Sequence, residues 1–95
     1  MIRESYRFRR FRVQADEEPD ADPRTYTARC AVCGLTGPTV EAVKEESPEA
    51  RAMSAEAARR AAAEWIPRHR DHHREHFSYH LLESTPYRVV PGEWL

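Results

Sequence analysis

The sequence predicts one small α+β domain over residues 1–95, with an N-terminal antiparallel hairpin, one long helix and a C-terminal strand that completes a small antiparallel sheet. Three observations indicate this class. Apolar and polar residues alternate over residues 5–13 and again over 77–90, as in strands that bury one face. Residues 55–74 are mostly Ala, Glu and Arg, which favour a helix. A chain of 95 residues has room for a single core.

The N-terminal part of the chain predicts the hairpin. The first strand covers residues 5–13, and a bulge at Arg9–Arg10 would bring its four apolar side chains to one face. Residues 14–24 are acidic and contain two prolines, which predicts a loop. The β-branched and aromatic residues 25–29 predict a second strand, which is antiparallel to the first and leads into a cysteine. A short third strand is expected within residues 35–40.

Serines and prolines indicate where the helix begins, where it breaks and how the final strand is divided. Ser47 is followed by Pro and Glu in the order that begins helices, and Ser54 is an equally good cap. Pro67 lies inside the helical pattern and predicts a kink or a break, because proline lacks an N–H donor and its ring clashes with the preceding turn. In the final strand, Pro86 restricts the strand to an edge position or divides it in two.

The composition excludes a membrane-spanning segment and indicates a small core. The mean hydropathy is −0.83, and no apolar run is long enough to cross a bilayer. Much of the 40% hydrophobic fraction is alanine, so we expect the core to need an additional cross-link. The first residues contain no apolar stretch of signal-peptide length. We therefore expect a cytoplasmic protein, in a reducing compartment where cysteines rarely form structural disulfides.

The two cysteines form a C-x2-C pair, Cys30 and Cys33, followed by Gly34. Two thiolates at this spacing can point at one metal ion, and the glycine lets the backbone turn tightly beneath them. A thioredoxin-like redox pair would need the first cysteine at the start of a helix, whereas here a strand leads into it. Free thiols without a function are the third alternative. The spacing favours a metal knuckle.

Histidines gather at the C-terminal end of the predicted helix. Four of the five histidines of the chain are His69, His72, His73 and His76. A closed zinc site takes four tetrahedral ligands, so two cysteines leave two positions for histidine. His69 with His73, and His72 with His76, both have the spacing that places two imidazoles on one helix face. The spacing alone leaves the choice of histidines open.

The order of these motifs resembles a small bacterial, zinc-finger-like domain family of unknown function. That family shows a strand ending in C-x2-C, a helix with W-x3-H-x6-H, an aromatic residue three positions further on, and a closing strand with an aromatic-R-V-x-P segment. The matching residues here are Cys30, Cys33, Trp65, His69, His76, Tyr79 and the segment 87–91. The resemblance implies the fold and one Zn²⁺ ion held by Cys30, Cys33, His69 and His76, with His72 and His73 as alternates.

The histidine pair that the resemblance implies requires the helix to end or unwind between the two ligands. His69 and His76 would lie about 10 Å apart along an ideal helix. They can bind one ion only if the helix ends or unwinds between them. Pro67 and the poor helix formers at residues 71–73 favour an end near His72, after which the chain can double back.

Two non-enzymatic functions follow from a zinc site of this kind. Four protein ligands leave no open position for a catalytic water, and the sequence shows no catalytic triad, phosphate-binding loop or paired carboxylates, so we expect a structural zinc and no enzyme activity. A net charge of −1 favours a module that binds another protein, with no membrane and no small-molecule substrate. The alternative is nucleic-acid binding by an arginine-rich surface. Its candidate residues are Arg7, Arg9, Arg10, Arg12, Arg68, Arg70 and Arg74.

Overall fold

The computed structural model describes the backbone of residues 9–94, and its contacts divide into two compact units. The larger unit comprises residues 23–84, and the smaller one combines the described residues before 23 with those after 84. No helix among the described residues is long and apolar enough to cross a membrane. The expectation of a single domain stays a prediction.

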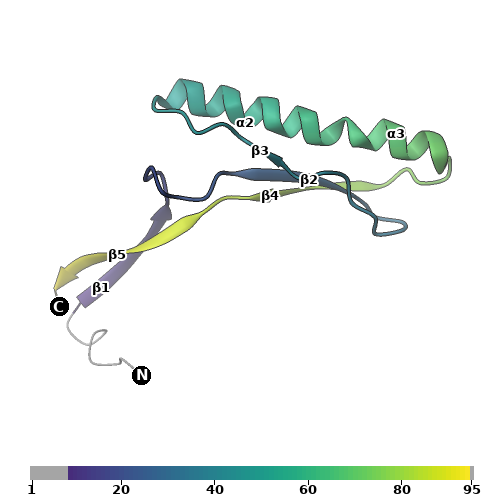
Figure 1. The fold of residues 1–95 in the computed structure, drawn as a ribbon. Helices are drawn as coiled ribbons and strands as arrows, with labels where there is room; N and C mark the ends of the chain where they lie inside the picture. The colour runs from purple at the N-terminus through teal and green to yellow at the C-terminus, as the bar shows by residue number, and fades with distance from the viewer. Residues whose placement is uncertain (1–8, 95) are drawn as a thin grey trace. The chain divides into compact units, whose positions relative to one another are not determined.

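The sheet of the larger unit has three antiparallel strands (Figure 1). Strand β2 (Thr25–Cys30) lies in the centre, between β3 (Val40–Glu41) and β4 (Tyr79–Ser84). The predicted second strand is thus confirmed. The third strand is shorter and begins later than the expected range 35–40, within which an isolated bridge joins Thr36 to Arg29.

The long helix begins at the first of the two candidate caps. Helix α2 (Pro48–Ala63) follows Ser47, whose side chain accepts a hydrogen bond from the Ala50 N–H at 3.1 Å. Helix α3 (Trp65–His72) continues α2 after an interruption at Glu64. In a regular helix, the N–H of residue 67 would donate to the carbonyl of Ala63, but Pro67 has no N–H. The helix is interrupted directly after Ala63, one turn before Pro67, so the break predicted from this proline is confirmed.

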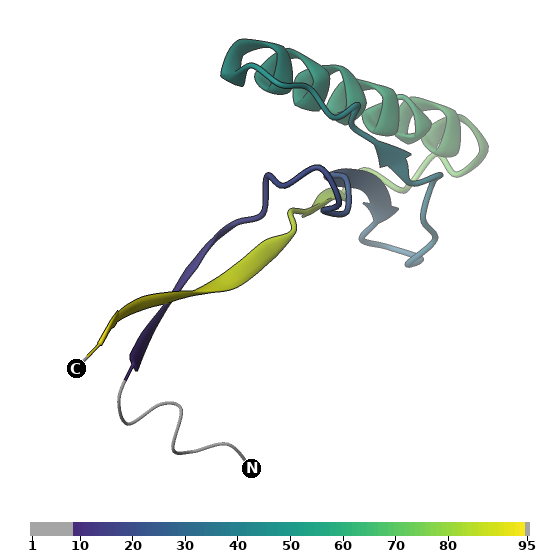
Figure 2. The same cartoon turned by 60° about the vertical axis from the view of Figure 1, so that its left-hand side comes forward.

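A small core joins the helix to the sheet. Figure 2 shows the helix along one face of the sheet of the larger unit. Tyr26 from β2 packs against three buried alanines of α2, and parts of β3, β4 and the segment after β3 surround them. The buried alanines are Ala55, Ala58 and Ala62. A core made of one aromatic ring and short alanine side chains supplies little hydrophobic stabilisation, as the composition predicts.

The smaller unit contains a two-stranded ribbon, and its pairing corrects one expectation. Strand β1 (Arg9–Ala15) pairs antiparallel with β5 (Tyr87–Trp94), whereas the sequence suggested pairing with the second strand. The second strand pairs with β4 instead. Because the predicted final strand is divided around Pro86, its two parts extend separately along β2 and β1. The α+β class with an antiparallel sheet is confirmed.

The expected bulge lies at the predicted position along the ribbon, beside Arg9 and Arg10, but in the other strand. Arg9 is opposite Trp94 and Phe11 is opposite Pro91, so the extra residue belongs to β5. Gly92 lies in this irregular stretch, where an added Cβ would come within 3.0 Å of the Arg10 carbonyl oxygen. A residue without a side chain is therefore needed where the two backbones approach closely. Tyr6 and Phe8, which the predicted strand includes, lie outside the described residues.

Candidate metal centre

The C-x2-C pair lies in a tight turn at the end of β2. The Gly34 N–H donates to the Cys30 carbonyl at 2.9 Å, and the Cys30 N–H donates to the carbonyl of Leu35 at 2.9 Å. Gly34 has a φ of 80°, a left-handed conformation that glycine adopts without strain. The turn places both thiols on the same side of the knuckle, which is the arrangement that the sequence motif predicts.

The helix end brings the distant histidine back. Helix α3 ends at His72, and His73 has left the helical conformation with φ −135° and ψ 75°. The His73 N–H donates to the His69 carbonyl at 3.0 Å, and the His76 N–H donates to the His73 carbonyl at 2.9 Å. These two bonds form a compact turn beyond the helix. The expectation that the chain doubles back near His72 is confirmed.

Four possible metal ligands meet between the knuckle and this turn. One donor atom from each of Cys30, Cys33, His69 and His76 lies within 4.8 Å of the other three. The His69 Nε2 atom lies 3.3 Å from His76 Nδ1 and 3.5 Å from Cys33 Sγ, and His76 Nδ1 lies 3.4 Å from Cys30 Sγ. Ligands of a tetrahedral zinc ion with ordinary bond lengths are separated by about 3.3–3.8 Å. The three closest of these separations match that range, so the four donors could hold a metal ion such as Zn²⁺.

The cluster is buried on one side and open on the other. Cys30 and His69 are buried, His76 is half-buried and Cys33 is exposed. Neither cysteine forms a disulfide. An ion held by these groups would lie at the margin of the unit, where it could exchange with solvent.

The surroundings of Cys30 and His69 favour the unprotonated forms that bind metals. Burial raises the pKa of the Cys30 thiol, but hydrogen bonds from the knuckle, chiefly from the backbone of Cys33 and Val32, outweigh it and lower the pKa below its ordinary value. Burial also lowers the pKa of His69, as do its charged histidine neighbours. Thiolate and neutral imidazole are the states that coordinate zinc.

Aromatic rings cover the buried side of the cluster. The indole of Trp65 stacks on the His69 ring with centroids 4.5 Å apart, and Tyr79 meets the same ring edge-on at 5.9 Å. Burial raises the pKa of Tyr79, and the nearby Cys30 and Cys33 thiolates raise it further. Its hydroxyl is buried and has no hydrogen-bond partner among the described residues. Tyr79 therefore stays a neutral phenol beside the cluster.

The other histidines take different places. The His73 ring stacks on both the His69 and the His76 rings, with centroids 4.4 and 4.9 Å away, but His73 is not part of the donor set. The exposed His72 donates from Nδ1 to the Arg68 carbonyl at 3.0 Å. His80 is exposed on β4. Neither of the two alternates, His72 and His73, belongs to the group of four donors.

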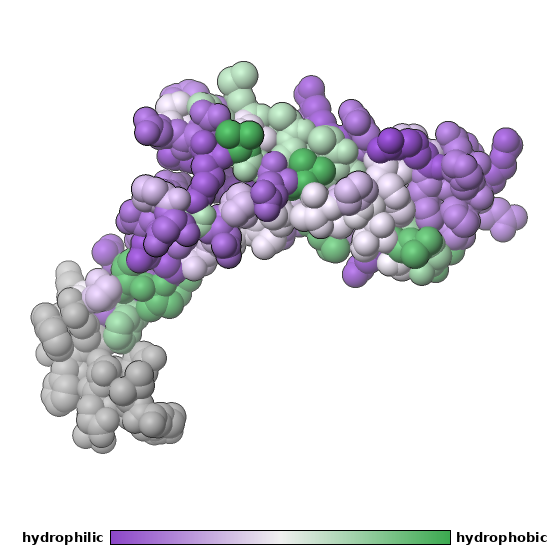
Figure 3. All heavy atoms as spheres, viewed as in Figure 1, coloured by the Kyte–Doolittle hydropathy of each residue, from purple (hydrophilic) through white to green (hydrophobic). Residues whose placement is uncertain are grey.

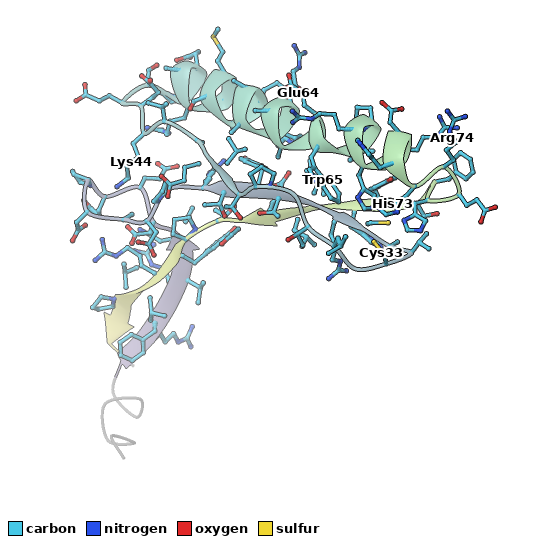
Figure 4. The ribbon with its side chains drawn as sticks, turned by 45° about the vertical axis from the view of Figure 1, so that its right-hand side comes forward. Cys33, Lys44, Glu64, Trp65, His73 and Arg74 are labelled. Carbon is cyan, nitrogen blue, oxygen red and sulfur yellow. The ribbon has the colours of Figure 1, made fainter. Side chains whose placement is uncertain are left out.

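Gly37 supports the site, although no motif in the sequence pointed to it. A Cβ atom on this residue would lie 2.5 Å from Cγ of Trp65, so the indole packs directly against the glycine backbone. Figure 4 shows Trp65 pointing from the helix toward the sheet. The glycine follows Thr36 and precedes Pro38, within the range 35–40 for which a short third strand was expected.

Replacement of Gly37 by alanine is expected to disturb the stack of Trp65 on His69. Overpacking of this kind typically costs about 1–3 kcal/mol. In a Trp94→Phe background, where Trp65 is the remaining tryptophan, Gly37→Ala should shift the fluorescence emission toward the red and lower the melting temperature of the zinc-loaded protein. An unchanged spectrum and melting temperature, compared with Trp94→Phe alone, would contradict the packing.

The arginines proposed for nucleic acid divide between the two units. Arg10 and Arg12 are exposed on β1, whereas three others are exposed at the end of α3 and in the following turn. These are Arg68, Arg70 and Arg74. Arg7 and the side chain of Arg9 lie outside the described residues. In the smaller unit, the acidic loop residues Asp16 and Glu18 pair with Arg88 of β5 at 3.5 and 3.4 Å.

The antiparallel sheet, the covering helix and the Cys2His2 cluster give the larger unit an α+β fold whose possible metal ligands are consistent with a zinc-finger-like pattern. The chain belongs to the DUF7848 family, a domain of unknown function whose family model matches residues 1–94. Neither the curated proteins nor the solved structures contain a significant match to the chain.

Proposed function

We propose that this chain is a structural-zinc domain that binds another protein. In this proposal, one Zn²⁺ ion is held by Cys30, Cys33, His69 and His76 and ties the knuckle to the end of the helix. The support is the fit of the four donor atoms to a tetrahedral ion. Four protein ligands fill the coordination shell, so the ion stabilises the fold and leaves no position for a reacting water. Enzyme activity is not part of the proposed function.

A groove in the larger unit carries the proposal of protein binding. It has a volume of about 540 Å³ and lies between α2 and residues 40–45. Val43 and Met53, which line it, are 67% and 74% exposed, unusually high for large apolar side chains. The only two charged residues among its lining are acidic, Glu41 and Glu45. An apolar groove with an acidic margin is suited to a partner segment that is both apolar and basic.

The wall of the groove is suited to a helical partner. Ala50, Ala57 and Ala61 line it from α2 and share one side of the helix at near-helical spacing. Short side chains allow a second helix to approach to the usual axial separation of about 8–10 Å. The Ser54 hydroxyl donates to the Val43 carbonyl at 2.8 Å and holds the opposite wall in place. We therefore assign the groove to a basic amphipathic helix of another protein, inserted with its apolar side inward.

The groove can be tested with the zinc-loaded protein and a fluorescent model peptide, an amphipathic helix with leucines on one side and lysines on the other. Binding is measured by fluorescence anisotropy. The protein variant Ala57→Arg fills the groove and adds a charge of the same sign as the peptide, so it should weaken binding at least about tenfold, equivalent to about 1.4 kcal/mol. Ala52→Arg is the matched control, because Ala52 is exposed on the same helix but does not line the groove. It should change binding less than twofold.

Several results of this titration would contradict the proposed groove. One is a peptide with glutamates in place of lysines that binds equally well. Another is an equal effect of the two arginine substitutions. A folded, zinc-loaded protein that binds neither peptide would overturn protein binding through the groove, while leaving the zinc assignment intact.

Nucleic-acid binding is the second candidate, and the exposed arginines at the end of α3 favour it. Arg68, Arg70 and Arg74 lie within one short stretch, and Arg70 extends over the ring of Phe77 with its guanidinium 5.1 Å from the ring centroid. Such a cluster can contact phosphates. A short DNA duplex and a single-stranded RNA are therefore the competing probes in the same titration. Tight, salt-dependent binding of either one, without binding of the peptide, would favour this second function.

A further inference from the structure

The two cysteines of the knuckle differ in their access to solvent. Cys30 is fully buried, with 0% of its surface exposed, whereas Cys33 is exposed. On the buried side of the cluster, the rings of Trp65 and Tyr79 lie against His69. A small molecule that reaches the cluster from solvent therefore meets the sulfur of Cys33 before that of Cys30.

The approach to Cys33 is lined by uncharged residues. Val32 and Leu35 are 57% and 56% exposed, and residues 30–37 contain no charged side chain. Figure 3 shows apolar surface where the knuckle follows β2, next to the hydrophilic surface of the helix end. A small, neutral solute meets no charged side chain of the knuckle on this path. The oxidation of a cysteine by such a solute depends on its exposure and on its thiolate character.

The knuckle holds its two sulfur atoms close together through its own backbone. The two Sγ atoms lie within 4.8 Å of each other, with two residues between the cysteines. The bonds from Gly34 to Cys30 and from Cys30 to Leu35 both lie inside the loop. A disulfide bond is about 2.05 Å long, so a movement within the knuckle is sufficient to form one. The chain has no other cysteine that could compete.

We propose that Cys30 and Cys33 form a redox-sensitive modification site, at which a hydroperoxide converts the two zinc-bound thiolates into a disulfide and releases the metal. The proposal rests on the zinc assignment of the proposed function and is independent of the groove. Coordination to zinc keeps both cysteines deprotonated, which is the form that reacts with peroxides. A thioredoxin-like pair would pass its disulfide to a substrate, whereas this disulfide alters the fold of its own chain.

Two steps with hydrogen peroxide account for the atoms and electrons. The Cys33 thiolate attacks one peroxide oxygen, the O–O bond breaks, hydroxide leaves and Cys33 becomes a sulfenic acid. The Cys30 thiolate then attacks the Cys33 sulfur, the S–S bond forms and a second hydroxide leaves. The two sulfurs together lose two electrons, and the peroxide is reduced to two hydroxide ions, which solvent protonates. Two thiolate ligands are thereby lost, and only His69 and His76 remain.

Oxidation should therefore act on the fold. The core of the larger unit consists of Tyr26 and three alanines, and it depends on the metal for stability. The oxidised chain should lose the helical structure of α2 and α3. A dithiol reductant together with zinc should restore it, because reduction regenerates both thiolates.

Hydrogen peroxide added to the zinc-loaded wild-type protein tests the proposal. Native mass spectrometry first establishes that the reduced protein carries one zinc ion per chain. Peroxide should then release this ion, measured with a colorimetric zinc indicator. The product should be two hydrogen atoms lighter than the reduced, metal-free chain. The helical circular dichroism signal should fall in parallel, and dithiothreitol with zinc should restore both the signal and the bound metal.

Two histidine substitutions separate the roles of the cysteines, because each keeps four possible zinc ligands. Cys33→His removes the exposed thiol and should release zinc at least about tenfold more slowly than the wild type. Cys30→His keeps the exposed thiol but lacks its partner, so a sulfenic acid should accumulate at Cys33 and be trapped by dimedone. Met53→Leu is the matched control. It removes a 74% exposed, oxidisable sulfur outside the site and should release zinc at the wild-type rate.

A brief treatment of the wild type with peroxide and dimedone, followed by peptide mass spectrometry, tests the order of attack without any substitution at the site. The adduct should lie on Cys33, and an adduct mainly on Cys30 contradicts the order. Zinc that stays bound throughout peroxide treatment overturns the redox site and leaves the zinc assignment intact. Release of zinc with sulfinic acids, or with disulfides between chains, overturns a reversible disulfide within one chain. A reduced, folded protein without zinc overturns both proposals.

Discussion

Chelation of zinc is expected to unfold the larger unit of the protein. The apparent binding free energy of a structural zinc ion in a small domain is about 10–16 kcal/mol, which exceeds or equals the whole stability of most small proteins. The core of Tyr26 and three alanines cannot replace this contribution. Native mass spectrometry should find one zinc ion per chain. Circular dichroism should show loss of the α2 and α3 signal when a strong chelator is added, with recovery on addition of zinc.

The knuckle offers a matched test of this expectation. Cys33→Ser removes one ligand and should behave like the chelated protein, although Cys33 is exposed and its loss leaves no cavity. Val32→Ser, in the same turn and also exposed, should bind zinc and melt like the wild type. A cooperative melting transition that is identical with and without chelator, in a protein free of metal, would contradict a structural zinc site.

The four clustered histidines are expected to divide into two classes when each is replaced by alanine. His69→Ala and His76→Ala should lower the zinc affinity by more than the roughly 10–100-fold that loss of a supporting residue costs, because each removes a ligand atom. Their melting temperatures should fall sharply. His72→Ala should change neither quantity, because its exposed imidazole bonds to the Arg68 carbonyl and is not part of the donor set.

His73→Ala is the most informative member of this series. The ring of His73 stacks on both His69 and His76, so its loss removes packing, but it contributes no donor atom to the cluster. Zinc stoichiometry should therefore stay at one, with a small decrease in melting temperature. Loss of the metal in His73→Ala with retention in His76→Ala would show that a regular-helix pair, His69 and His73, is used instead.

Local features of the fold could be predicted because neighbouring residues determine them. The Ser47 side chain accepts a hydrogen bond from the first turn, Pro48 needs no partner for a missing N–H, and Glu49 adds a negative charge there, so the structure begins the helix at Pro48. Pro67 interrupts the helix by its effect on the preceding turn. The helix end at His72, which permits His76 to return beside His69, follows from the same proline and from poor helix formers.

Features that depend on distant residues could not be predicted in the same way. The alternation of residues 5–13 indicates a strand but contains no information on its partner, and β1 pairs with β5 near the other end of the chain. The close contact between Gly37 and Trp65 is equally non-local, because it needs the helix to be placed over the sheet first. The resemblance indicated the Cys2His2 set because it carried the arrangement of these distant segments with it.

The order of the four proposed ligands along the chain has a consequence for folding kinetics. The two cysteines are close in sequence, and so are His69 and His76, but Cys30 and His76 are 46 residues apart. Either half can capture an ion while the rest of the chain is still unfolded. Completing the coordination sphere must then close a long loop that contains β3 and all of α2, and this closure carries an entropic cost. Zinc would thus close this loop reversibly, and binding of the second pair of ligands would be the slow step of folding.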